Sequence, residues 1–261
     1  MSTGTSDPHP AHVTAIRQIV ETRSSIPFCK ERHKLNVENP PQRFSQNEFW
    51  SHTVACICTA VTRIGPGTSF DRFFGERPFP LRLEVCEAKA DLHSWAEQTL
   101  STNGIRFAKI RAGWFEANLS RLQNGLWTVV EDHFYKLAQA RFQTPELAQA
   151  KIILERNAAK TIMGEAGGLK GAGPKQARNI WQCMGVTQFE IPLDSRVCNW
   201  AQNLQPPFPI DTDKLYRSVP YYEAVMSQIQ VLCQAARILP CDFDAAVFSA
   251  PEDARSNHAL E

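Results

Sequence analysis

The chain has 261 residues, with 28 Lys and Arg against 27 Asp and Glu, so its formal net charge at pH 7 is only +1. This near balance excludes a protein that coats nucleic acid indiscriminately, and any nucleic-acid binding has to come from a local patch. The hydrophobic fraction of 43% is that of an ordinary globular protein. Because no apolar run approaches membrane-spanning length and the N-terminus has no signal-peptide core, we expect a cytoplasmic protein with no membrane partner.

The N-terminal quarter of the chain is predicted to hold two helices. Residues 1–10 contain Ser, Thr, Gly and Pro and are expected to form a tail. A helix is predicted over 11–23, and the prolines of the next segment predict a loop over 24–45. Asn47 is a suitable N-cap for an apolar helix over 48–64 that belongs to the core.

The next segment reads as an aromatic cluster followed by more helix. Gly65-Pro66-Gly67 is expected to end the preceding helix. Four aromatic side chains beside two prolines predict packing between elements: Phe70, Phe73, Phe74 and Phe79. Apolar residues at helical spacing then predict helices near 81–100, 106–122 and 126–142.

A glycine-rich turn between two helices is the most distinctive feature of the second half. Apolar residues at helical spacing predict a helix over 146–163. Pro174 suits the first position of a helix over 175–184, which Gly185 would end. Between these helices lie four glycines: Gly167, Gly168, Gly171 and Gly173.

Three more helices are predicted towards the C-terminus. Asp194 begins a helix, and the loop 205–209 leads to an amphipathic helix over 221–239. Pro240 would end that helix, and a last short helix covers 241–249. Continuous helical periodicity predicts an all-α fold, with a few short strands in the first half as the alternative.

The glycine-rich turn has the features of a phosphate-binding site. Glycines let two backbones approach closely, and the first N–H groups of the second helix have no partner inside that helix. Those N–H groups and the helix dipole favour an anion. Six basic residues against Glu155 and Glu165 give the surrounding sequence a local charge of +4: Lys151, Arg156, Lys160, Lys170, Lys175 and Arg178. A turn between core helices with a solvated charged face is the alternative.

The segments LKGAGPKQA and IPLDSRV resemble the helix-hairpin-helix DNA glycosylases, and in particular their 8-oxoguanine glycosylase/AP-lyase members. The resemblance is strong over 167–200 and weak elsewhere. It implies two helical subdomains flanking a cleft, with 11–122 and 205–250 contributing to the first and 123–204 forming the catalytic one. Residues 251–261 would be a tail.

The resemblance implies a role for each of several residues. Lys175 would attack the sugar C1′ as a neutral amine, and Asp194 would stabilise the positive charge that develops on the sugar. A phosphate contact for Lys175 and a purely structural cap for Asp194 are the alternatives. The residues expected to hold DNA phosphates are Gly171, Gly173, Lys170 and Gln176.

Base recognition is implied at two other places. Asp244 and Phe248 would contact the extruded base, and without the resemblance the carboxylate would be a charge near a helix N-terminus. Asn124 would fill the space left by that base; the alternative is a helix C-cap in which Gly125 is left-handed.

No cofactor is expected. The eight cysteines include no C-x-x-C pair, which favours buried reduced thiols, and the iron–sulfur ligands of some relatives are lacking. A monovalent cation at the hairpin is left open. The expected partner is double-stranded DNA, bound by a monomer.

Three functions remain open. The first is a DNA glycosylase with AP-lyase activity on an oxidised purine such as 8-oxoguanine. Because Asp244 replaces the amide of well-known relatives, the second is removal of a hypermodified cytosine, glucosylated or hydroxymethylated, from phage DNA. The third is a monofunctional glycosylase or a non-catalytic DNA-binding module.

Overall fold

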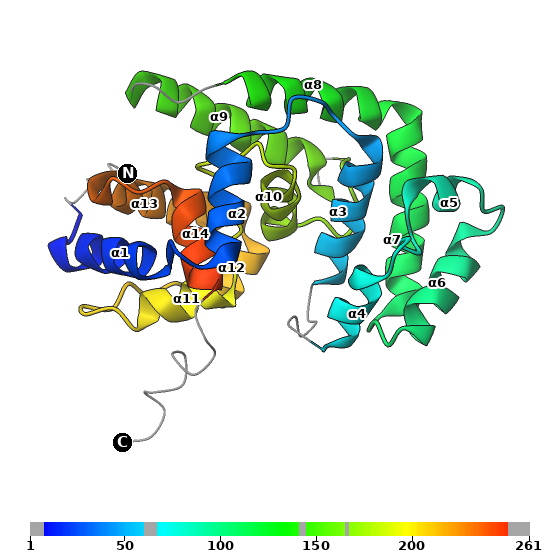
Figure 1. Ribbon diagram of the computed structural model, residues 1–261, viewed down its shortest axis with the longest axis horizontal. Helices are drawn as coiled ribbons and strands as arrows, with labels where there is room; N and C mark the ends of the chain where they lie inside the picture. Colours follow the sequence, from blue (N-terminus) through cyan, green and yellow to red (C-terminus); the bar gives the residue numbers. More distant parts are fainter. Residues whose placement is uncertain (1–7, 60–66, 141–144, 165–166, 250–261) are drawn as a thin grey trace. The chain divides into compact units, whose positions relative to one another are not determined.

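The computed structural model describes residues 8–59, 67–140, 145–164 and 167–249. Within these ranges every regular element is a helix, and the only extended pairing is an isolated bridge between Met163 and Leu169 (Figure 1). The predicted all-α fold is therefore confirmed. No helix in the described ranges is both long and apolar enough to cross a membrane.

The chain divides into two compact units. Unit 1 combines Met1–Pro40 with Thr187–Glu261, and unit 2 is Pro41–Val186. These divisions lie at other positions than the ones expected at 122/123 and 204/205. Unit 1 is discontinuous in sequence because the N-terminal helices pack on the C-terminal ones.

Unit 1 is built around a long C-terminal helix. Its elements are α1 (Pro10–Arg23), α2 (Pro27–His33), the π-helix η1 (Lys34–Glu38), α11 (Ser195–Gln202), α12 (Thr212–Arg217), α13 (Val219–Ala236) and α14 (Pro240–Phe248). Helix α1 packs on α13 and α14, and α2 packs on α14. Arg17 of α1 donates to the carbonyls of Ala235 and Ala236, at the end of α13, at 3.0 Å each. A cation at a helix C-terminus is favourably placed, so this contact ties the two ends of the chain together.

Unit 2 holds the remaining helices. They are α3 (Gln46–Cys58), α4 (Ser69–Gly75), α5 (Leu83–Glu87), α6 (Leu92–Thr102), α7 (Ala108–Arg121), the π-helix η2 (Leu122–Leu126), α8 (Trp127–Gln139), α9 (Pro145–Ile162) and α10 (Pro174–Cys183). Helices α6 and α7 lie side by side, as do α8 and α9, and α10 packs on both α3 and α9 (Figure 1). The core includes Trp50, whose indole N–H donates to the Leu81 carbonyl at 2.8 Å.

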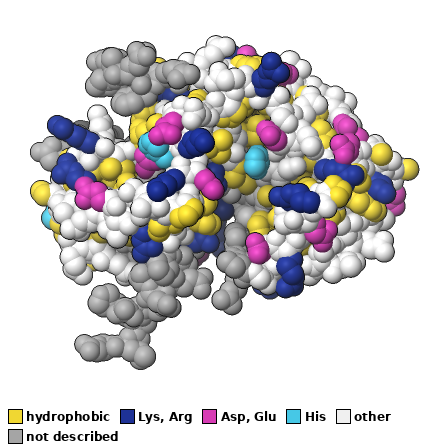
Figure 2. Space-filling model, in the orientation of Figure 1, with side chains coloured by type: hydrophobic (Ala, Val, Ile, Leu, Met, Phe, Trp, Pro, Cys, Tyr) yellow, Lys and Arg dark blue, Asp and Glu magenta, His cyan; other side chains and the backbone are white. Residues whose placement is uncertain are grey.

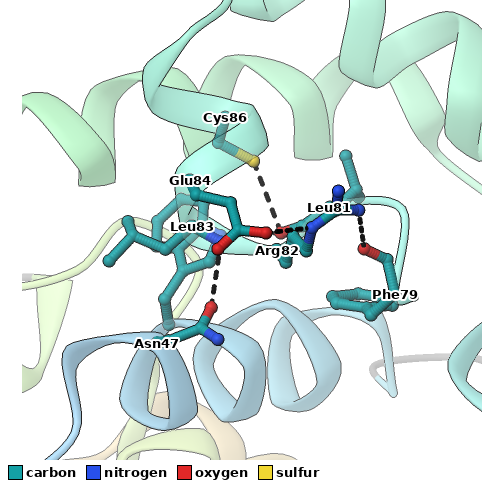
Figure 3. Close-up of polar contacts among 8 residues, drawn as sticks. Asn47, Phe79, Leu81, Arg82, Leu83, Glu84 and Cys86 are labelled. Atoms are coloured by element: carbon teal, nitrogen blue, oxygen red, sulfur yellow. Dashed lines mark hydrogen bonds and ion pairs between the residues drawn. The ribbon is translucent and has the colours of Figure 1, made fainter. Parts of the chain in front are cut away.

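The start of α3 differs from the prediction in its capping residue. Ser45, rather than Asn47, is the N-cap, and its hydroxyl accepts from the Glu48 N–H at 3.2 Å. The Asn47 side chain instead accepts from the Leu83 N–H at 3.2 Å and so satisfies the first turn of α5 (Figure 3). Asparagine is a favourable N-cap residue, but because α5 packs on α3, the Asn47 side chain hydrogen-bonds to the neighbouring helix and not to its own.

One segment predicted as a loop is helical, and one further helix was not predicted. The loop expected over 24–45 contains α2 and η1, because Pro27 occupies the first turn of α2 and Cys29 is buried. The segment before 221 contains α12, whose N-cap Asp211 accepts from the Lys214 N–H at 3.0 Å. Gly65 and Pro66, most of the N-terminal tail and the predicted tail at 251–261 lie outside the described residues.

Candidate active site and nucleic-acid interface

The glycine-rich segment between α9 and α10 folds back on the end of α9. Gly168 donates its N–H to the Met163 carbonyl at 3.1 Å, and Leu169 donates to Ile162 at 3.0 Å. A side chain at Gly168 would place its Cβ 2.5 Å from the Ile162 carbonyl carbon, so only glycine permits this approach. Gly171 has a φ of +80°, a left-handed conformation that also favours glycine. Residues 165 and 166 of this segment lie outside the described ranges.

One face of α7 holds the glycine-rich segment in place. The buried Asn118 side chain donates to the Lys170 carbonyl at 2.9 Å and accepts from the Lys170 N–H at 2.6 Å. Arg121 donates to the Gly168 carbonyl, and a Cβ on Gly171 would lie 2.5 Å from the Trp114 ring. These α7 residues were not predicted from the sequence. Their spacing of four and three, which places them on one helix face, was the available signal.

The start of α10 leaves backbone donors available. Pro174 is the first residue, as predicted, and the N-cap Gly173 offers no side-chain cap. No described residue accepts from the N–H groups of Gly171, Gly173, Lys175 and Gln176. Lys170 is exposed, and Lys175 and Gln176 are partly exposed. The Lys175 amine makes no hydrogen bond or ion pair with any described residue, so donors and amine are accessible to a ligand.

The basic residues of this region do not all face the same surface, which corrects the predicted local charge. Lys151 is buried, and its amine donates to the carbonyls of Leu137 and Ala140 at 2.9 Å each and lies 3.9 Å from Glu155. Arg178 is buried as well, and donates to the Pro174 carbonyl at 3.1 Å. Lys151 therefore stabilises the end of α8, and neither cation belongs to the surface of the glycine-rich segment.

Charges on the molecular surface are mixed elsewhere too. On the face shown in Figure 2, Lys and Arg side chains are interspersed with Asp and Glu side chains and with small hydrophobic areas. The face in this view carries no broad basic field for nucleic acid. Because Lys151 and Arg178 are buried, recognition at the start of α10 would depend on a few local groups, which include Lys170 and Lys175.

Asp194 is the N-cap of α11, as the sequence predicts. Its Oδ1 accepts from the N–H groups of Arg196 at 2.8 Å and Val197 at 3.3 Å, and its Oδ2 lies 3.3 Å from the Arg196 guanidinium. The preceding strand-like segment is fixed by Tyr222, whose hydroxyl accepts from the Leu193 N–H at 2.7 Å. The carboxylate side chain is 21% exposed, so it is held in place yet open to solvent on one side.

Phe248 and Asp244 lie one turn apart on α14. The Phe248 ring is contacted by the Arg196 guanidinium carbon, 4.0 Å from its centroid, and stacks on Phe28 at 4.8 Å. Arg196 therefore links the Asp194 carboxylate to the Phe248 ring within unit 1. Asp244 is partly exposed.

The neighbouring carboxylate on α14 has a structural partner. Asp242 accepts from His33 at 2.9 Å. Burial raises the pKa of Asp242 above its ordinary value, and the His33 hydrogen bond opposes that increase. Asp242 therefore joins α14 to α2.

Asn124 lies in η2, where α7 and α8 meet. The side chain is exposed and donates to the Ser120 hydroxyl at 3.3 Å. Gly125 has a φ of +109°, the left-handed conformation expected for the alternative reading as a helix terminus. The role of Asn124 towards DNA stays a prediction.

The cysteines are free thiols, and all except Cys183 are buried. Burial raises the pKa of Cys58 and Cys86 to about 12 and that of Cys198 to about 11. Within the described ranges, no three His, Cys, Asp or Glu side chains group as metal ligands do.

The predicted site residues fall into two groups. Unit 2 contains Asn124, Lys170, Gly171, Gly173, Lys175 and Gln176, and unit 1 contains Asp194, Asp244 and Phe248. The second group adds Arg196 and Phe28, which were not predicted because their contacts with Phe248 join residues far apart in sequence. No protein-family model, no curated protein and no solved structure shows a significant match to this chain.

Proposed function

We propose that this protein is a DNA glycosylase that excises a modified base and then cleaves the strand as an AP lyase. The observation that carries the proposal is the Lys175 amine. It is partly exposed, makes no hydrogen bond or ion pair with any described residue, and belongs to a segment with four available backbone N–H groups, those of Gly171, Gly173, Lys175 and Gln176. Backbone donors of this kind bind phosphate without reading sequence, which suits an enzyme whose selectivity lies in a base pocket.

In the proposed reaction, the Lys175 nitrogen bonds to C1′ of the deoxyribose while the glycosidic bond breaks. The electron pair of that bond leaves with the base, which takes up a proton. Loss of the ring oxygen from C1′ gives a Schiff base, and removal of a C2′ proton expels the 3′ phosphate. No metal or redox cofactor takes part in these steps.

Asp194 supports this chemistry as a fixed anion. Two backbone N–H groups and Arg196 hold the carboxylate, so little reorganisation is needed when positive charge develops on the sugar. The Arg196 guanidinium also contacts the Phe248 ring. A base that stacks on Phe248 would displace the Arg196 guanidinium from the ring and would then bind near the Asp194 carboxylate.

The leading substrate is an oxidised purine such as 8-oxoguanine in double-stranded DNA. The second candidate is a glucosylated or hydroxymethylated cytosine of phage DNA. Asp244 is the observation that favours this second substrate, because a carboxylate accepts hydrogen bonds from the amino group of a cytosine-like base. Asp244 is partly exposed on α14, one turn from Phe248.

Borohydride trapping tests the lyase. A duplex with the target base, incubated with protein and borohydride, is expected to give a covalent adduct, and Lys175→Gln is expected to abolish it. Lys136→Gln removes an exposed cation of the same unit that lies outside the glycine-rich segment, and it is expected to keep the adduct. An adduct that persists in Lys175→Gln would refute the assignment of the nucleophile.

Mass spectrometry of released bases identifies the substrate. Oxidised duplexes, alkylated duplexes and phage DNA with modified cytosines are compared, with Asp194→Asn as the inactive control. Release without an adduct would make the protein a monofunctional glycosylase. Binding to duplexes without release of any base would make it a non-catalytic DNA-binding module and overturn the enzymatic proposal.

A further inference from the structure

The start of α7 exposes large apolar side chains beside basic ones. Phe107 is 49% exposed and Ile110 is 54% exposed, whereas most large apolar residues of unit 2 are buried. Arg106 and Lys109, next to them in sequence, are exposed as well. The one acidic residue of α7, Glu116, lies 3.9 Å from His93 of α6. It follows Lys109 by seven residues, so it lies on the same side of α7, about 10 Å further along the helix.

Phe107 is held in an unusual conformation. Its φ of +57° lies in the left-handed region, which a bulky L-residue rarely adopts. The guanidinium carbons of Arg106 and Arg111 lie 5.6 and 5.8 Å from its ring centroid. Two cations at this distance fix the ring while about half of the residue stays in solvent. An immobilised exposed ring loses little conformational entropy when a ligand stacks on it.

This surface continues from the residues that hold the glycine-rich turn. Ile110, Trp114, Asn118 and Arg121 follow one another at steps of four, four and three, so they share a face of α7. Asn118 binds the backbone of Lys170. Phe107 precedes Asn118 by eleven residues, which corresponds to about 17 Å along the helix, or roughly five nucleotide steps of a DNA strand.

We propose that Arg106, Phe107, Lys109 and Ile110 form a second nucleic-acid contact. The Phe107 ring stacks on an unpaired base there, and the Arg106 and Lys109 side chains contact flanking phosphates. An aromatic platform with adjacent basic groups is the arrangement that binds single-stranded nucleic acid without sequence preference. The charge of the patch favours a polyanion. The inference rests on the proposed function in taking DNA as the ligand, and it adds a site remote from the glycine-rich turn along α7.

Fluorescence anisotropy with undamaged DNA tests this contact. The probes are a labelled oligothymidylate of about 20 nucleotides and a duplex of the same length. Phe107→Gly removes the ring and suits the left-handed backbone, so the fold is expected to persist. We expect it to weaken binding of the single strand about five- to tenfold, and that of the duplex less. Phe107→Trp is expected to preserve binding.

The charges are tested through the salt dependence of the same measurement. Arg106→Gln with Lys109→Gln is expected to reduce the slope of log K against log salt for the single strand by about 1.4. Two controls are matched to these changes. Val129→Ala alters another exposed apolar residue of unit 2, and Lys214→Gln with Arg217→Gln removes two exposed cations of α12.

Wild-type affinity in Phe107→Gly, or equal losses in the controls, would overturn the inference, and an acidic protein would then be the better ligand for the patch. The two proposals fail separately. If no duplex loses a base but Phe107→Gly still weakens binding, the glycosylase assignment falls and this contact stands. If bases are released and Phe107→Gly binds normally, only the contact falls.

Discussion

Asn118→Ala is the substitution that most directly tests how the glycine-rich turn is held. The Asn118 amide is buried and makes two hydrogen bonds to Lys170, of 2.6 Å from its N–H and 2.9 Å to its carbonyl. Alanine would leave both backbone groups of Lys170 without this partner. Each buried polar group that loses its partner costs about 1–3 kcal/mol. Because Lys170 is exposed and water can replace part of the lost bonding, we expect the free energy of unfolding of unit 2 to fall by about 2–4 kcal/mol.

The assay combines denaturation with hydrogen exchange. For a unit of this size the expected loss corresponds to a fall in Tm of about 4–16 °C. Hydrogen exchange is expected to accelerate in peptides that span Lys170, because the turn separates from α7 before the helices unfold. Duplex binding should weaken as well, since Lys170 and the donors at the start of α10 lose their fixed position.

Asn124→Ala is the matched control. Asn124 is exposed and its amide makes one long hydrogen bond, of 3.3 Å, to Ser120. Its replacement is expected to change the free energy of unfolding by about 0.5 kcal/mol or less. If Asn118→Ala proves as mild as Asn124→Ala, and exchange at Lys170 is unchanged, the account of α7 as the support of the turn is refuted.

Three further predictions concern glycine, thiol and carboxyl groups. In denaturant titrations, Gly171→Ala should lower the free energy of unfolding by about 1–3 kcal/mol more than Gly67→Ala does. Both glycines have a φ near +80°, but only at Gly171 would the added Cβ contact Trp114. Equal losses for the two variants would contradict this contact. In Ellman's assay of the native protein, one thiol should react fast, and Cys183→Ser should remove that phase; a fast phase that persists would show that a buried thiol is accessible. Burial raises the pKa of Asp242, so its protonated form favours the folded state, and its contribution to stability is lost as pH rises through the folded pKa. Asp242→Asn does not titrate at this position, so the stability of this variant relative to wild type should increase as the pH rises above the ordinary pKa of an aspartate, about 4. A difference that stays constant with pH would argue against the raised pKa.

Features encoded by neighbouring residues were predicted correctly. Pro174 begins α10, Gly185 follows it with a φ of +74°, and Asp194 caps α11 through the N–H groups of Arg196 and Val197. Each of these signals acts within four residues of its own position, through a fixed φ, a missing side chain or a short polar one. The all-α fold follows from the same local periodicity.

Features that depend on residues far apart in the sequence were not predicted correctly. Ser24–Ser45 reads as a loop because of its prolines, yet α2 forms there and its Phe28 stacks on Phe248 of α14. Lys151 reads as part of a basic surface, yet its amine satisfies carbonyls at the end of α8. Neither the burial of Lys151 nor the stacking of Phe28 can be predicted from ten neighbouring residues of sequence, since both depend on which helices pack together.

The sequence by itself determined that the chain is helical, where the glycine-rich turn lies, and that Lys175 and Asp194 stand at helix starts. Tertiary structure decided which of the charged residues remain available, because burial converts a cation such as Arg178 into an internal hydrogen-bond donor. It also decided what supports the turn: Asn118 and Lys170 are 52 residues apart, and only packing of α7 against that segment brings the amide to the backbone it holds.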